Sequence, residues 1–186
     1  MNKEKKIIEE SLMRVLLRKK FKDIAIDEVL RSSKIKSEKF YSLFQNKEQI
    51  LVSFFNRIDL IMKKKIKKMN LGRNIKDNLF EVCMTRFELL NSYRESINNI
   101  YSSIKIKPNI KIDLYDSFFN SMKLILKLSY VNIKPINGHI NLIVFSLIYL
   151  SIQHQWFEDF SINNEKTMAV LDKRLSMIEN LLIKVG

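Results

Sequence analysis

Residues that interrupt helices are almost absent from this chain. It contains 3 Gly and 2 Pro among 186 residues, although these two residue types are the strongest local breakers of regular structure. The rest of the chain is rich in Leu, Ile, Lys, Glu and Met, and its apolar residues recur at helical spacing over long stretches. This composition favours an all-α protein of about nine helices, with enough chain to bury a substantial core.

The apolar periodicity and the break signals set the expected helix boundaries. Helices are predicted over 4–19, 27–33, 38–43, 47–69, 75–91, 94–105, 110–130, 139–160 and 164–184. Breaks are expected at Leu71–Asn74, at Pro108 and over 134–138. Ser37 and Asn46 suit the N-cap positions of the third and fourth helices, because their short side chains accept from backbone N–H groups.

The first part of the chain is expected to be a three-helix helix-turn-helix domain over 1–48. Two of its predicted helices are short and separated by a turn at 34–36, and an aromatic-rich segment, Phe40–Phe44, follows. In a helix-turn-helix, the second short helix fits the major groove of DNA. The helix at 47–70 then connects this domain to a second helical domain over 71–186.

Positive charge is concentrated in the same part of the chain. Residues 1–69 hold 19 Lys and Arg against 9 Asp and Glu, so they carry +10 of the +13 formal net charge. An excess of this kind is expected of a phosphate-binding surface. A lysine-rich composition also decorates any exposed helix, so it is the helix-turn-helix pattern that favours DNA binding.

Catalysis is not expected from this sequence, and neither a metal nor a cofactor is predicted. His139 and His154 are 15 residues apart and have no neighbouring Cys or His at metal-ligand spacing. The 3 glycines are scattered, which excludes a glycine-rich phosphate loop. Glu158 and Asp159 are adjacent and point in different directions on a helix. The single cysteine, Cys83, excludes an intramolecular disulfide and fits a reducing compartment.

No membrane span is expected. Glu9 and Glu10 interrupt the apolar run near the N-terminus, which excludes a signal peptide. The most apolar segment, Ile140–Ile152, is too short by itself to cross a bilayer. We therefore expect a soluble, cytoplasmic protein.

Residues 7–55 resemble the N-terminal domain of the TetR family of transcriptional regulators. The resemblance is carried by Phe21, Ile26–Val29, Ile35, Phe40–Phe44, Asn46–Glu48 and Ile50–Leu51. It implies a homodimeric repressor that binds a pseudo-palindromic operator and releases it when a small, hydrophobic ligand binds. The chain departs from the family pattern at Lys20 and Lys34, where glycine is usual, and at Glu38 and Lys39, where small residues are usual.

The predicted DNA contacts lie on or beside the helix at 38–43. Lys36, Ser37, Lys39 and Ser42 are polar enough to face a groove, and the resemblance implies phosphate contacts from Tyr41 and Lys47. Phe40 and Phe44 are expected in the core. If Lys34 takes the left-handed backbone conformation that glycine usually supplies in this turn, the strain of a non-glycine residue there costs about 1 kcal/mol.

The second domain is predicted to hold a ligand pocket and the contact between two copies of the chain. The pocket candidates, most of them large and apolar, are Phe80, Met84, Phe87, Tyr101, Phe118, Met122, Tyr149, Gln153, His154 and Trp156. The last two helices are apolar on more than one face, which predicts a four-helix dimer interface. Its candidate residues are Leu147, Leu150, Leu171, Leu175, Ile178 and Leu182.

Two alternatives remain at this point. The segment Trp156–Leu175 is similar to the C-terminal segment of some TetR-like regulators and of a related ubiquinone-biosynthesis lipid-binding protein. In the first alternative, the chain is a lipid or isoprenoid carrier whose N-terminal helix-turn-helix domain is degenerate and no longer reads DNA. The other alternative is a basic protein that binds DNA without sequence preference, in a strongly salt-dependent way.

Overall fold

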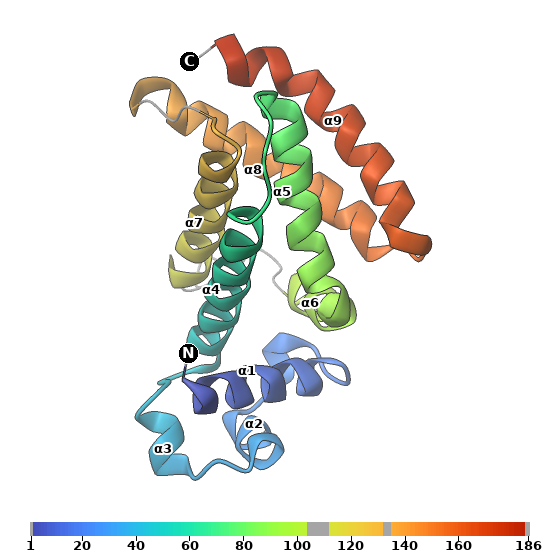
Figure 1. Cartoon of the computed structure of the whole chain (residues 1–186). Coiled ribbons are helices and arrows are strands. Elements are labelled where there is room, and N and C mark those ends of the chain that lie inside the picture. The colour runs from blue at the N-terminus through green and yellow to red at the C-terminus, as the bar shows by residue number, and fades with distance from the viewer. Residues whose placement is uncertain (1, 104–111, 132–134, 185–186) are drawn as a thin grey trace. The chain divides into compact units, whose positions relative to one another are not determined.

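The computed structural model describes residues 2–103, 112–131 and 135–184, and it describes their side chains except at 112, 135–137 and 179–184. All regular structure in these ranges is helical (Figure 1). The α-helices are α1 (Lys3–Leu16), α2 (Ile26–Ser33), α3 (Ser37–Tyr41), α4 (Lys47–Ile66), α5 (Ile75–Leu90), α6 (Arg94–Tyr101), α7 (Ile112–Leu128), α8 (Pro135–Phe157) and α9 (Glu165–Lys184). Three 3₁₀ turns, η1 (Phe21–Asp23), η2 (Asn91–Tyr93) and η3 (Ile162–Asn164), lie between them. The all-α prediction and the order of the predicted helices are confirmed.

Two expectations about helix ends were wrong. The predicted break over 134–138 is absent from 135 onward, because α8 begins at Pro135 and continues through Gly138. Proline is compatible with the first helical position, since the N–H that it lacks has no partner there. Ser37 is the first residue of α3 rather than its cap, and the cap residue, Lys36, makes no side-chain cap bond. The break predicted at Pro108 lies outside the described residues.

The predicted cap of α4 is present. The Oδ1 of Asn46 accepts from the backbone N–H of Gln49 at 2.9 Å, so one of the unpaired N–H groups at the start of the helix is satisfied.

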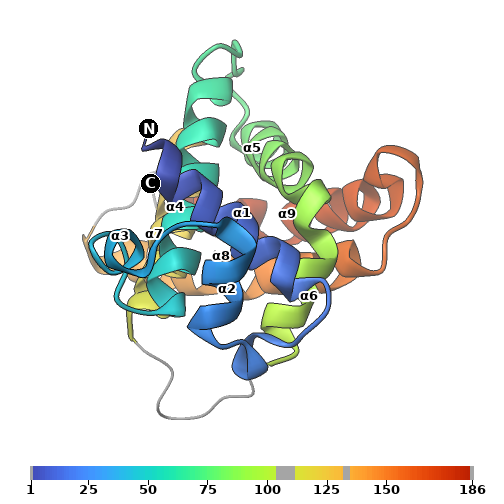
Figure 2. The same ribbon diagram turned by 90° about the horizontal axis from the view of Figure 1, so that it is seen from below.

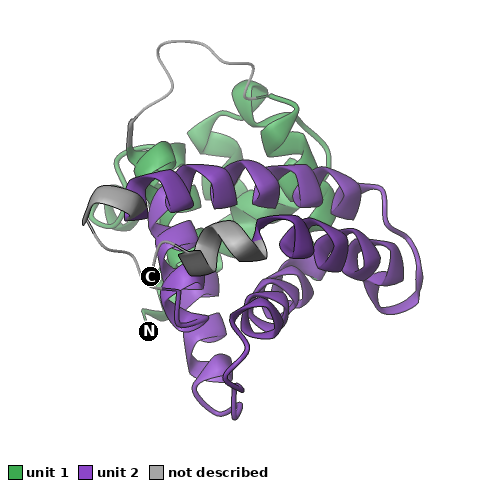
Figure 3. Cartoon of the chain, turned by 90° about the horizontal axis from the view of Figure 1, so that it is seen from above, with its two compact units in different colours: residues 1–57, 92–117 green, residues 58–91, 118–186 purple. Residues whose placement is uncertain are grey.

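The chain forms two compact units (Figure 3). Unit 1 consists of residues 1–57 and 92–117, and unit 2 consists of residues 58–91 and 118–186. The boundaries fall inside α4 and α7, so these helices contribute to both units. These units are defined by packing within the chain. The division into functional domains at 1–48 and 71–186 stays a prediction.

Unit 1 is built around α1, which packs against α2 and α6 (Figure 2). One face of α1 is buried because Ile8, Leu12 and Leu16 recur at helical spacing. A buried polar cluster joins α1 to α4, in which Arg57 pairs with both Glu9 and Glu10. Removing one partner of a buried ion pair leaves an uncompensated charge and is strongly destabilising, so this cluster holds residues 47–57 of α4 against α1.

Unit 2 has α8 as a core helix. Trp156 and Tyr149 are fully buried, and the polar side chains of Asn141, Ser146 and Gln153 are buried beside them. Residues Gly138–Phe157 are long and apolar enough to span a membrane by length and composition alone, a longer stretch than the run Ile140–Ile152 noted in the sequence. The apolar pattern continues past Ile152 into the last turns of α8. The buried polar side chains and the packing against α9 are those of a core helix.

Candidate functional site

The turn between α2 and α3 depends on one residue in an unusual backbone conformation. Lys34 adopts φ 56° and ψ 24°, in the left-handed region, and its N–H donates to the carbonyl of Leu30 at 3.0 Å. This conformation ends α2 and lets α3 begin three residues later. The strain expected for a non-glycine residue at this position is therefore present.

Buried aromatic side chains anchor α3 in unit 1. Phe40 is fully buried and Phe44 nearly so, with their ring centroids 6.2 Å apart. The ring of Tyr41 meets that of Phe40 edge-on at 5.3 Å, yet Tyr41 is 53% exposed. The other four residues of this short helix, Ser37, Glu38, Lys39 and Tyr41, are exposed.

Five of the six predicted DNA contacts are exposed on or beside α3, namely Lys36, Ser37, Lys39, Tyr41 and Ser42. Two of them have partners in unit 1. The Nζ of Lys39 lies 3.1 Å from a carboxylate oxygen of Glu4 on α1, and the hydroxyl of Ser42 donates to the Lys39 carbonyl at 2.7 Å. An ion pair this exposed contributes little stability.

The sixth residue, Lys47, points into unit 1. Its Nζ donates to the carbonyl oxygens of Phe21 at 2.7 Å and Ile24 at 2.8 Å, and lies 4.9 Å from the centroid of the Phe21 ring. Burial lowers the pKa of this lysine. The ammonium thus ties the start of α4 to η1, and its predicted phosphate contact stays a prediction.

The predicted ligand-pocket residues are only partly brought together. In unit 2, the ring of Tyr149 is stacked on that of Phe87 at 5.2 Å; Trp156 lies 5.5 Å from Phe87, and Phe118 6.5 Å from Tyr149. Met84, Met122 and Gln153 are buried in the same unit, and Phe80 is half-buried. The two remaining candidates depart from the expectation, because Tyr101 belongs to unit 1 and His154 is exposed.

A buried charged network in unit 2 was not predicted from the sequence. The guanidinium of Arg86 donates to Asp59 at 3.1 Å and to the hydroxyl of Tyr149 at 2.7 Å. Ser121 donates to the other carboxylate oxygen of Asp59. Burial lowers the pKa of Arg86, but its interactions with Tyr149 and Asp59 raise the pKa by more. The net pKa lies above its ordinary value, so the side chain stays charged. The sequence carried only a weak signal, because Asp59 and Arg86 lie among apolar residues in two separate helices.

Asn141 on α8 is the most unusual polar group in the described part of unit 2. Its side chain is fully buried, and neither the Nδ2 nor the Oδ1 atom has a hydrogen-bond partner. Buried amides are nearly always paired in folded proteins, and leaving one unpaired costs about 1–3 kcal/mol.

The predicted dimer residues fall into two groups. Leu171, Leu175 and Ile178 are buried within the single chain, where α9 packs against α5 and α8, which removes them from the exposed surface. Leu147 is 64% exposed and Leu150 is half-buried, and the side chain of Leu182 lies outside the described residues.

Leu147 belongs to an exposed row on α8. It shares its helix face with Ile140, which is 57% exposed, and Ile143, which is 54% exposed. We refer to Ile140, Ile143 and Leu147 as the α8 apolar face.

The fold is similar to that of solved regulators of transcription. A TetR transcriptional regulator from Nitrosomonas europaea ATCC 19718 matches with a TM-score of 0.76 and 14% identity, covering 95% of this chain and 98% of that one. A TetR transcriptional regulator from Rhodococcus sp. RHA1 matches with a TM-score of 0.59 and 12% identity, over 91% of this chain and 96% of that one. The dihydroxyacetone kinase operon activator DhaS matches with a TM-score of 0.51 and 16% identity, over 98% of this chain and 95% of that one.

No protein-family model matches the sequence, and no curated protein matches it significantly. At these identities the structural matches establish the fold. The chain therefore has the fold of TetR transcriptional regulators over nearly its whole length, as the resemblance at residues 7–55 implied.

Proposed function

We propose that this chain regulates transcription by binding a pseudo-palindromic operator as a homodimer, and that a ligand in unit 2 releases the operator. The observation that carries the proposal is the exposed polar face of α3, held over the buried ring of Phe40. A short, rigidly seated helix with its polar side chains outward has the form required for reading a major groove.

The side chains on and beside α3 are suited to different parts of the DNA. Lys36 and Lys39 supply cations for phosphates, which position the protein without reading sequence. Ser37 and Ser42 can donate to or accept from base edges, and Glu38, exposed on the same helix, can accept from a cytosine amino group. Tyr41 is 53% exposed, and its hydroxyl suits a phosphate.

The α8 apolar face supports the homodimer. A chain with a net charge of +13 repels a second copy, but Gly138–Phe157 contains no Lys, Arg, Asp or Glu. In a twofold dimer the same patch meets itself, so an uncharged apolar face is suited to the contact. Two copies then present two α3 helices to two operator half-sites.

Asn141 supports a ligand site in unit 2. A bound molecule with one acceptor and one donor, such as an amide or a hydroxyl-bearing carbonyl compound, would pair both atoms of its buried side chain. The neighbouring buried side chains are largely apolar, so the rest of the ligand is expected to be hydrophobic. This class includes lipids, so the lipid-carrier alternative is decided by whether the chain also reads DNA.

Repression is the proposed direction of regulation, although one protein of this fold, DhaS, is described as an operon activator. The direction is measured by placing the identified operator upstream of a reporter gene, with and without the protein. A drop in reporter expression supports repression, and a rise shows activation.

The DNA-binding proposal is tested by selecting fragments of the source genome with the purified full-length chain at near-physiological salt. We expect a few fragments that share a palindrome. The variant Lys36→Ala with Tyr41→Ala is expected to lose them, whereas Lys67→Ala, an exposed lysine beyond α4, serves as the control and retains them. Random fragments would indicate a nonspecific binder, and no fragments together with extractable lipid would indicate the lipid carrier.

A further inference from the structure

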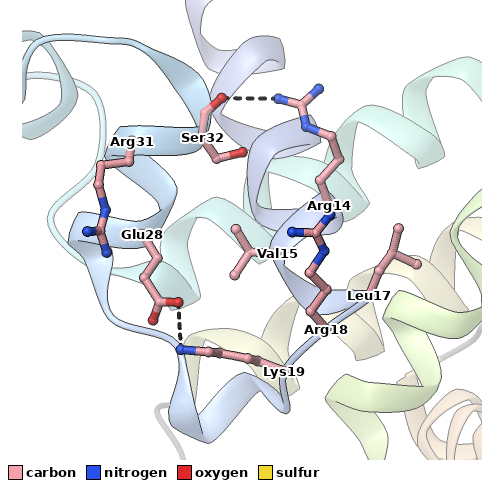
Figure 4. A pocket seen from close by; sticks show the side chains of 8 residues that line it. All are labelled: Arg14, Val15, Leu17, Arg18, Lys19, Glu28, Arg31 and Ser32. Atoms are coloured by element: carbon pink, nitrogen blue, oxygen red, sulfur yellow. Dashed lines mark hydrogen bonds and ion pairs between the residues drawn. The ribbon is translucent and has the colours of Figure 1, made fainter.

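The helices α1 and α2 of unit 1 leave a groove of about 530 Å³ between them (Figure 4). Two contacts cross it at opposite ends. The Nζ of Lys19 lies 2.7 Å from a carboxylate oxygen of Glu28, and a guanidinium nitrogen of Arg14 lies 3.4 Å from the carbonyl of Ser32. Val15 lies between these contacts in the view of Figure 4. The groove is thus bounded at both ends and has an apolar side chain within it.

The walls of this groove are strongly positive. Arg14 and Arg18 stand on one side and Arg31 on the other, and Lys19 adds a fourth positive charge. Glu28 is the one carboxylate among the lining residues, which leaves an excess of three positive charges. The C-terminal end of a helix such as α1 carries about half a negative charge, which is too small to offset this excess.

The single carboxylate of the groove is already engaged. Glu28 pairs with Lys19 and accepts from the backbone N–H of Ala25 at 3.1 Å. The hydrogen bond from Lys19, followed by that from Ala25, lowers the pKa of Glu28, so it stays ionised and bound to these partners. Arg18 and Arg31 have no ion pair within the described residues. Their donors are therefore available to a bound anion.

We propose that this groove binds a small molecule carrying a phosphate group, held between the guanidinium groups of Arg18 and Arg31. Guanidinium groups match the spacing of phosphate oxygens and donate two parallel hydrogen bonds to them. Val15 offers an apolar contact to the organic part of the molecule. The groove volume, about 530 Å³, lies within the range of roughly 300–1,000 Å³ that is typical of small-molecule sites.

The groove is separate from the exposed face of α3. Lys39 of α3 pairs with Glu4 near the start of α1, whereas Arg14 lies in its last turn and Arg18 just beyond its end. Ten residues of helix between Glu4 and Arg14 span about 15 Å. The proposed site therefore does not use the side chains assigned to DNA, and it does not depend on the proposed operator binding.

The test is calorimetric titration of inorganic pyrophosphate into the full-length chain, without DNA and at constant ionic strength. We expect saturable binding that Arg18→Gln with Arg31→Gln weakens by about tenfold or more, because two charge-assisted contacts are lost. The matched control, Lys3→Gln with Lys6→Gln, removes two charges from exposed positions in the first turn of α1 and is expected to bind as the parent does. Arg18 and Arg31 are exposed, so the variant is expected to fold, and each single variant provides the same comparison.

Two results would overturn the proposal. If both double variants lose pyrophosphate affinity equally, the binding is diffuse attraction to a basic protein and needs no groove. If the parent does not bind pyrophosphate, no such site exists. In that case, loss of affinity for a random-sequence duplex in the Arg18 and Arg31 variant alone would identify the groove as a contact for the DNA backbone.

Discussion

The ammonium of Lys47 lies 2.7 Å from the carbonyl oxygen of Phe21, 26 residues earlier in the chain. It also donates to the carbonyl oxygens of Lys22 and Ile24, so a single side chain satisfies three backbone acceptors of the loop between α1 and α2. The first turn of α4 and this loop are therefore held together by charge-assisted hydrogen bonds.

Replacing Lys47 with methionine is expected to destabilise the protein by about 1–3 kcal/mol, because partly buried carbonyl groups lose a charged donor. The measurement is the urea midpoint of unfolding. Lys63→Met, an exposed position on the same helix, is the control and is expected to change little. Unchanged stability combined with weaker DNA binding would instead indicate that Lys47 contacts phosphate.

Asp159 is expected to make stability depend on pH in the acid range. Burial raises the pKa of its carboxyl group, but hydrogen bonds from Ser161 and Thr167 lower it to about 2, from an ordinary value of 3.8. Because the folded-state pKa is depressed, the stabilisation is complete above pH 3.8 and is lost as the pH falls through about 2.

The variant Asp159→Asn is therefore expected to lose about 2 kcal/mol near neutral pH. The difference from the parent should shrink between pH 4 and pH 2, and denaturant unfolding across this range measures it. Glu158→Gln, at the exposed neighbouring position, is the control. A difference that does not vary with pH would show that the charge of Asp159 is not what stabilises the start of α9.

The pair formed by Asp59 and Arg86 is expected to behave as a unit. Arg86→Met alone leaves a buried carboxylate without its cation and should cost about 3–5 kcal/mol. Adding Asp59→Asn should restore part of this loss, since no uncompensated charge then remains. A double-mutant cycle in urea measures the coupling energy.

The exposed pair of Lys65 and Glu88, 2.9 Å apart, provides a matched comparison for that cycle. Because both side chains are about half exposed, its coupling energy should not exceed about 1 kcal/mol. Equal coupling in the two pairs would mean that burial does not strengthen the pair of Asp59 and Arg86.

Ile143→Lys with Leu147→Lys is expected to convert the proposed dimer into a folded monomer. Both side chains are more than half exposed in the single chain, so the substitutions leave its core intact but bring four like charges together in the dimer. Sedimentation velocity measures the change, and circular dichroism checks the fold. Met177→Lys, which adds a charge at an exposed position on α9, is the control, and a dimer that survives the double substitution would place the interface elsewhere.

The order of the helices was predictable because apolar spacing is a local signal. The inward position of Phe40 and Phe44 followed from the same pattern. By contrast, the partners of Lys47 lie 23 to 26 residues away in the chain, and no local pattern indicates that a lysine donates to distant carbonyls. The pairing of Asp59 with Arg86 across 27 residues was hidden for the same reason.

The last two helices show a different limit of sequence reasoning. Periodicity indicated that α8 and α9 are apolar on more than one face, but it does not distinguish burial within one chain from burial between two. Leu171 and Leu175 are covered by the same chain, whereas Leu147 is not. That distinction depends on tertiary packing, which the spacing of apolar residues does not contain.

The absence of charge on α8 has a consequence for how the proposed regulator responds to ionic strength. Added salt screens the attraction between lysine side chains and phosphates, which weakens binding of the helix-turn-helix domain to DNA. The same salt screens repulsion between two chains of charge +13 and leaves the contact between two uncharged α8 faces intact. Operator occupancy at low protein concentration is therefore expected to pass through a maximum as salt rises, with assembly limiting on one side and phosphate binding on the other.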